Sequence, residues 1–235
     1  MTLLGIDTST ALCAVAVVSD GRVLASKTAG VPQAHAEKLL SIIDACLLAA
    51  GTPDRRPDAV AVASGPGSFT GLRIGFSTAK GICFARGAAL VAVPTFDAWA
   101  FNAVKDDRVP AGSSILTVMS AGREDAYAAL FRRAGTGFVT EREPAVYALR
   151  DLPALAGRPG DAAIIADDRA RAADWFPGIS PDRIAAAAGL SDNPAIDVAL
   201  LGEMMCRGGV TADLRYAEPA YVKDFSYKLK NGKGA

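Results

Sequence analysis

Residues 2–28 read TLLGIDTSTALCAVAVVSDGRVLASKT and predict three consecutive strands. The apolar run of residues 2–8 and the Val- and Ala-rich run of residues 11–19 are typical of buried strands. The Asp-Gly dipeptide that follows indicates a hairpin turn, because glycine tolerates the positive φ that such turns require. Residues 22–28 then alternate between polar and apolar as a third strand does.

Helices and strands alternate after this opening unit. Apolar residues between about 35 and 50 follow the three-to-four spacing of one helical face. Residues 58–63 read as a fourth strand, and we expect a second helix over residues 68–86. A strand at 88–93 and a helix at 95–104 complete the segment. The order β-β-β-α-β-α-β-α predicts an α/β fold.

The second half begins with a similar pattern but shows no sequence identity to the first. Residues 157–194 are rich in Pro, Gly and Asp and read mostly as loop. The predicted strands are 114–119, 124–132, 137–141 and 162–166, and the predicted helices are a weak one near 149–156, a short one ending near 175 and a last one at 195–207.

Two lobes of similar pattern follow from this order. We expect a first lobe over residues 1–109 and a second over residues 110–222. The last predicted helix, 195–207, belongs to the second lobe in sequence but is able to pack on the first. Residues 223–235 contain four Lys and one Asp and no periodic apolar face, which predicts a basic, flexible tail.

Composition excludes several classes of function. The 235 residues carry 25 Lys and Arg against 25 Asp and Glu, so the chain has no strong overall attraction to nucleic acid. The four cysteines are scattered, which argues against a structural zinc site and for a reducing compartment. His35 is the only histidine, so a two-His metal site cannot be built from this chain alone.

Location is predicted from the same sequence. The N-terminus lacks a signal-peptide pattern, and no run of about 18 apolar residues appears. We therefore expect a cytoplasmic protein with no membrane contact.

Two polar segments are candidates for phosphate or nucleotide binding. A Gly-Pro-Gly loop followed by Ser68 leads into the second helix, and such a helix start can bind an anion through free backbone N–H groups. The loop matches neither the Walker A nor the GxGxxG pattern, so a purely structural turn remains the alternative. A polar turn after the first strand is the other segment. The candidate residues are Asp7, Thr8, Ser9, Gly65, Gly67 and Ser68.

Small residues recur every four positions along the second helix, at Gly67, Gly71, Gly75, Ala79 and Cys83. Glycine inside a helix costs roughly 1 kcal/mol relative to alanine, so this stripe requires a close contact in compensation. The contact is either the chain's own sheet or another subunit. Large apolar residues on a second side of the helix favour another subunit.

Four segments together resemble the TsaB (YeaZ) family of tRNA threonylcarbamoyladenosine biosynthesis. They are GIDTS at 5–9, HAEKLL at 35–40, SGPGSFTGLRIG at 64–75 and AEPAYV at 217–222. The resemblance is good over the first 105 residues and poor over residues 135–195. It implies an actin/sugar-kinase-like (ASKHA) fold of two ribonuclease-H-like βββαβα lobes, within the superfamily that contains the TsaD/Kae-type proteins.

The resemblance also implies a role. It implies a non-catalytic subunit that binds and stabilises the catalytic threonylcarbamoyltransferase TsaD, that meets tRNA only within the complex, and that forms a homodimer when alone. An ATPase, TsaE, is the other implied partner, and no cofactor or metal of its own is expected, ATP or ADP entering only with the complex. The implied interface residues are His35, Leu39, Ile42, Ile43, Cys46, Phe69, Gly71, Leu72, Arg73, Gly75, Phe76 and Ala79.

One departure from the family pattern bears on the alternatives. Ser120 and Gly122 replace the Asp and the first Arg that the family carries at the first strand pair of the second lobe. A small-molecule kinase or ATPase of the same fold would need a carboxylate in the cleft between the lobes, and only Asp7 of the first lobe is a candidate. A metalloprotease-like enzyme is the third reading, and a single His without HExxH argues against it.

Overall fold

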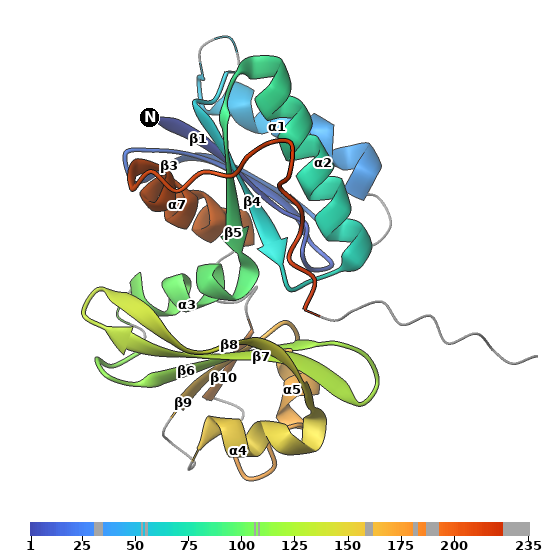
Figure 1. Cartoon of the computed structure of the whole chain (residues 1–235), viewed down its shortest axis with the longest axis vertical. Coiled ribbons are helices and arrows are strands. Elements are labelled where there is room, and N and C mark those ends of the chain that lie inside the picture. Colours follow the sequence, from blue (N-terminus) through green and yellow to red (C-terminus); the bar gives the residue numbers. More distant parts are fainter. Residues whose placement is uncertain are drawn as a thin grey trace, which may run out of the picture.

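The computed structural model describes residues 1–30, 35–52, 54, 56–105, 107, 109–157, 162–180, 183–186 and 193–222. Two five-stranded sheets, each flanked by helices, lie one above the other (Figure 1). The predicted basic tail, residues 223–235, lies outside the described residues. Within them, no helix combines the length and apolarity needed to cross a membrane.

The first sheet has the strand order β3-β2-β1-β4-β5. Strands β1 (Thr2–Asp7), β2 (Cys13–Ser19) and β3 (Arg22–Ala29) pair antiparallel, and β4 (Ala59–Gly65) and β5 (Ala89–Pro94) continue the sheet parallel to β1. The central strands are almost entirely buried because helices cover both faces, which explains their continuous apolar runs. The predicted α/β order of the first half is confirmed.

Helices α1 (His35–Ala49) and α2 (Phe69–Arg86) cover one face of this sheet, and α7 (Pro194–Arg207) covers the other (Figure 1). Helix α7 therefore packs on the first lobe, although it follows the second lobe in the sequence. Gly5 on β1 permits this packing, because a Cβ at that position would lie 2.6 Å from the Ala195 carbonyl oxygen.

Two buried carboxylates fasten α7. Glu203 accepts hydrogen bonds of 2.8 Å from the backbone N–H groups of Asp20 and Gly21, at the turn between β2 and β3. Asp197 accepts one of 2.7 Å from Asn102 and pairs with Lys105 on α3 (Thr95–Lys105). The helix is thus tied to the hairpin at one end and to α3 at the other.

The second sheet has the order β10-β9-β6-β7-β8. It consists of β6 (Ser114–Ser120), β7 (Asp125–Ala134), β8 (Gly137–Ala148), β9 (Ala162–Ala166) and β10 (Ile184–Ala186). The short η2 (Leu149–Asp151), α4 (Leu152–Ala156) and α5 (Arg169–Ala173) accompany it. Figure 1 shows α3 between the two sheets, where its Phe96 and Trp99 pack into the second lobe's core.

Two predictions for this lobe are wrong: one strand is longer than predicted, and one strand was not predicted at all. Strand β8 continues seven residues past the predicted end at 141, because it pairs with β7 as far as Ala148 opposite Asp125. Strand β10 was predicted as loop, yet Ile184–Ala186 pairs parallel to β9. Three residues in a Pro- and Gly-rich segment carry too little periodicity to predict a strand.

Candidate functional site

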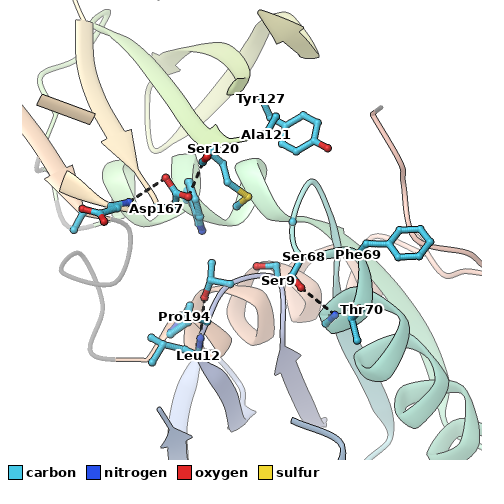
Figure 2. A pocket seen from close by; sticks show the side chains of 18 of the residues that line it. Ser9, Leu12, Ser68, Phe69, Thr70, Ser120, Ala121, Tyr127, Asp167 and Pro194 are labelled. Carbon is cyan, nitrogen blue, oxygen red and sulfur yellow. Dashed lines mark hydrogen bonds between the residues drawn. The ribbon is translucent and has the colours of Figure 1, made fainter. Parts of the chain in front are cut away.

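A cavity of about 1020 Å³ lies between the lobes. Figure 2 shows Ser9, Ser68 and Thr70 of the first lobe facing Ser120, Tyr127 and Asp167 of the second. The first wall is formed by the turn after β1 and the start of α2, and the second by the end of β6 and the segment after β9. The remaining lining residues are Thr10, Ala11, Leu12, Gly67, Phe69, Gly71, Ile74, Trp99, Met119, Ala121, Asp168, Arg169, Ala186 and Pro194.

The turn after β1 is held by its own side chains. Asp7 is buried and accepts hydrogen bonds from the backbone N–H of Ser9 at 2.8 Å and from the Ser9 hydroxyl at 2.7 Å. Burial raises the pKa of the Asp7 carboxyl above its ordinary value, although both bonds from Ser9 oppose the shift. This carboxylate therefore orders the turn, and it does not line the cavity.

The start of α2 is fastened to the same turn. The Thr8 hydroxyl donates to the Gly71 carbonyl at 2.7 Å, and the Ser68 backbone N–H donates to the Ser9 carbonyl at 2.7 Å. Ser68 is the N-cap residue predicted from the sequence, and its hydroxyl accepts from the Gly71 N–H at 3.2 Å. The turn and the helix start thus form one connected wall.

The glycine stripe makes this approach sterically possible. A Cβ at Gly67 would lie 2.7 Å from the Ser9 carbonyl oxygen, and a Cβ at Gly71 or Gly75 would overlap atoms of Thr8. The stripe therefore contacts the chain's own turn after β1. The prediction that favoured another subunit is wrong, because the compensating contact for the glycines is internal.

The six phosphate candidates divide into two groups. Ser9, Gly67 and Ser68 line the cavity, whereas Asp7, Thr8 and Gly65 are buried beneath its wall. The first-lobe wall of the cavity therefore presents hydroxyl groups and backbone atoms. The Asp7 carboxylate does not line the cavity and instead accepts hydrogen bonds from Ser9.

The second wall has a carboxylate that sequence analysis missed. Asp167 follows β9 and accepts a hydrogen bond of 3.2 Å from the backbone N–H of Ser120 at the end of β6. Burial raises the pKa of Asp167 above its ordinary value. The available signal was an Asp-Asp pair directly after the predicted strand 162–166, since the carboxyl ends of parallel strands meet at one edge of a sheet.

Most of the predicted interface residues are buried in the first lobe. Helices α1 and α2 are where the sequence placed them, but the residues chosen on them face the sheet, which corrects the prediction of a partner contact at these positions. Ile42 and Phe69 are partly exposed and Arg73 is exposed, while the His35 side chain lies outside the described residues. The buried ones are Leu39, Ile43, Cys46, Gly71, Leu72, Gly75, Phe76 and Ala79.

The outer face of the same two helices carries large exposed apolar side chains. Leu40 and Leu48 on α1 are 61% and 64% exposed, and Phe84 on α2 is 86% exposed. Sequence analysis missed these residues because it took the apolar residues of the first helix as one face and did not count Phe84 among those of the second.

Arg73 lies at the end of this outer face that is nearer the cavity. Its guanidinium carbon is 3.9 Å from the centroid of the Phe69 ring, and its Nε donates to the Tyr221 hydroxyl at 3.1 Å. The Phe69 and Tyr221 rings are 5.1 Å apart between centroids. No group of three or more His, Cys, Asp or Glu side chains that could hold a metal ion occurs among the described residues.

Comparison with known proteins shows which family this architecture belongs to. The model of the family described as TsaD, tRNA N6-adenosine threonylcarbamoyltransferase, matches residues 22–176. The tRNA threonylcarbamoyladenosine biosynthesis protein TsaB of Escherichia coli is 31% identical over 137 residues, 58% of each chain. An uncharacterized protein of Mycobacterium tuberculosis is 34% identical over 206 residues, 83% of this chain and 88% of that one.

A solved structure extends the comparison over nearly the whole fold. YeaZ from Pseudomonas aeruginosa superposes with a TM-score of 0.76 at 26% identity, covering 94% of this chain and 99% of that one. In sequence, by contrast, the chain spans about half the length of the TsaB relatives that it matches.

Proposed function

Since the chain belongs to the TsaD-like family that includes TsaB (YeaZ), we propose that it acts in tRNA N6-threonylcarbamoyladenosine biosynthesis as a non-catalytic subunit. Its partner in this proposal is a TsaD-type threonylcarbamoyltransferase, which it binds and stabilises in the active conformation. The end-to-end similarity to YeaZ is the observation that carries the proposal. The zero net charge fits a protein that meets tRNA only through such a complex.

The outer face of α1 and α2 is the surface that we assign to the partner. Leu40, Leu48 and Phe84 are large apolar side chains that water contacts in the isolated chain. Burying them against another protein removes apolar area from water, which is the main favourable contribution to association. Arg73 extends the surface toward the cavity, and aromatic and Arg side chains are the types that most often dominate binding energy.

The kinase alternative receives no support from the first-lobe wall of the cavity. A phosphoryl-transfer enzyme of this fold needs a carboxylate in the cleft between the lobes; Asp7 is the first-lobe candidate, and Asp167 lines the second wall. Asp7 instead accepts two hydrogen bonds from Ser9 and does not line the cavity. Asp7 is only 1% exposed, so its carboxylate is closed off from the cavity in this structure.

The first experiment measures association with the TsaD-type protein of the same organism by calorimetry. Phe84→Glu places a charge at the most exposed large apolar side chain, and we expect it to weaken binding by at least about 30-fold, as loss of a dominant interface residue does. Val139→Glu is the matched control, because Val139 is also an exposed apolar residue but lies on β8 of the second lobe.

The second measurement is the threonylcarbamoyladenosine content of bulk tRNA, by mass spectrometry, in cells depleted of the chain. We expect the nucleoside to collapse on depletion and to return with the wild-type chain and with Val139→Glu, but not with Phe84→Glu. An unchanged nucleoside level after depletion would refute the proposed function. Recovery with both variants would refute only the assignment of the surface.

A further inference from the structure

The chain ends its described part in an extended segment that crosses the first lobe. We call residues 212–222 the C-terminal strap. It starts at the edge of the first sheet, where the Ala212 backbone N–H donates to the Leu90 carbonyl at 2.8 Å. Figure 1 shows it passing β5 and descending beside α2 toward the second lobe.

The strap is tied to α2 and to the end of β4 at several points. The Lys80 ammonium donates to the Ala217 carbonyl at 3.0 Å, and the Ala220 N–H donates to the Ser64 carbonyl at 2.7 Å. The fit is close at Gly65, where φ is +113° and a Cβ would lie 2.7 Å from the Ala220 carbonyl oxygen. Gly65 is the last residue of β4, and three residues separate it from α2.

The last tie is a cluster of side chains. The Arg73 guanidinium lies over the Phe69 ring, and its Nε donates to the Tyr221 hydroxyl at 3.1 Å. Phe69 packs against Tyr221 on one side and lines the cavity between the lobes on the other. Through this cluster the strap reaches the cavity wall and one end of the exposed outer face of α2.

We propose that Tyr221 is a positioning residue, and that the strap acts as a latch which holds the start of α2 in place through Arg73 and Phe69. The start of α2 is also joined to the lobe by the Thr8 and Ser9 contacts at the β1 turn. The latch fixes it from the opposite side. With the latch open, Arg73 and Phe69 lose their common partner, and the cavity wall and the end of the outer face become mobile together.

Amide hydrogen exchange on the full chain tests the latch. Tyr221→Ala removes a hydrogen bond and an aromatic contact, so we expect exchange at Ala220 and in the first turn of α2 to become about tenfold faster. Tyr221→Phe keeps the ring and loses only the hydroxyl, and we expect it to restore part of the protection. The thermal unfolding midpoint should stay within about 2 °C of the wild type, because Tyr221 is 41% exposed.

Tyr216→Ala is the matched control. Tyr216 lies on the same strap with its side chain 77% exposed, and we expect its removal to leave exchange in α2 unchanged. Exchange in Tyr221→Ala within twofold of the wild type would overturn the proposal. Equal acceleration by Tyr216→Ala would also overturn it, since the effect would then belong to the strap in general.

A second measurement rests on the proposed function. If the outer face of α2 binds the transferase, Tyr221→Ala should weaken that association several-fold, and Tyr221→Phe should weaken it less. A wild-type chain that does not bind the transferase would contradict the proposed function while leaving the exchange result intact. Unchanged exchange in a chain that does bind would contradict the latch alone.

Discussion

Replacing Gly71 by alanine tests whether the glycine stripe packs internally. A Cβ at Gly71 would overlap the Thr8 carbonyl oxygen, far inside the 3.0 Å that real Cβ contacts respect. Overpacking costs about 1 to 3 kcal/mol, and loss of the Thr8–Gly71 hydrogen bond about 0.5 to 1.5 kcal/mol. The higher helix propensity of alanine returns at most about 1 kcal/mol. The sum spans about 0.5 to 4.5 kcal/mol, and we expect a net loss of unfolding free energy near its centre, about 2 to 3 kcal/mol.

Circular dichroism during heating and in urea measures this loss in the isolated chain. For a chain of this size, the expected destabilisation lowers the unfolding midpoint by about 5 to 10 °C. Gly81→Ala is the control on the same helix, because a Cβ there meets nothing within 4 Å. We expect it to stabilise the chain by up to about 1 kcal/mol. If Gly71→Ala unfolded at or above the wild-type temperature, the internal contact would be refuted, and a partner contact for the stripe would be restored.

Two further predictions concern carboxylates, that of the half-buried Asp97 and that of the buried Glu203. Burial, with a smaller contribution from the Glu143 charge, raises the pKa of Asp97 to about 6, so the folded state binds a proton that the unfolded state releases near pH 4. The stability that this bound proton contributes to the folded state is present below pH 4 and is lost as the pH rises through 6. Asp97→Asn should therefore raise the urea midpoint relative to the wild type at pH 8 and leave it unchanged at pH 3.5. An equal difference between variant and wild type at the two pH values would contradict the raised pKa. Glu203→Ala leaves the N–H groups of Asp20 and Gly21 without their acceptor and should cost about 2 to 4 kcal/mol in urea unfolding, whereas Glu203→Gln should retain part of that stability.

The first lobe was predictable because its local signals agree with its long-range packing. Residues 11–19 are apolar along their whole length, and β2 is buried on both faces. Ser68 is a strong N-cap residue, and α2 begins at the next position. The second lobe was less predictable, because β10 is three residues long and depends on its pairing with β9. Such pairing has no trace in the sequence around Ile184.

At the candidate site, prediction from the sequence failed for a different reason. Sequence analysis predicted both helices of the outer face correctly. It was wrong about which side of each helix faces the sheet and which side faces outward. Gly71 and Gly75 were read as an opening for another subunit, because glycine spacing reports a close contact without naming the contacting atoms. The deciding atoms belong to Thr8, more than sixty positions away, and a single sequence carries no signal for that proximity.

The internal contact of the stripe determines where a partner can bind. Because Gly71, Gly75 and Ala79 face β1 and the sheet, the opposite side of α2 must face outward, and Arg73, Gly81 and Phe84 lie there. An open position at Gly81 beside an exposed Phe84 offers a second helix both a close approach and an apolar anchor. A partner that uses this side can associate without disturbing the Ser9 and Thr8 contacts that close the cavity wall. Binding at the Phe84 end of α2, far from the Arg73 cluster, is therefore separable from the integrity of the cavity wall, and variants at Phe84 and Gly71 should lose one without the other.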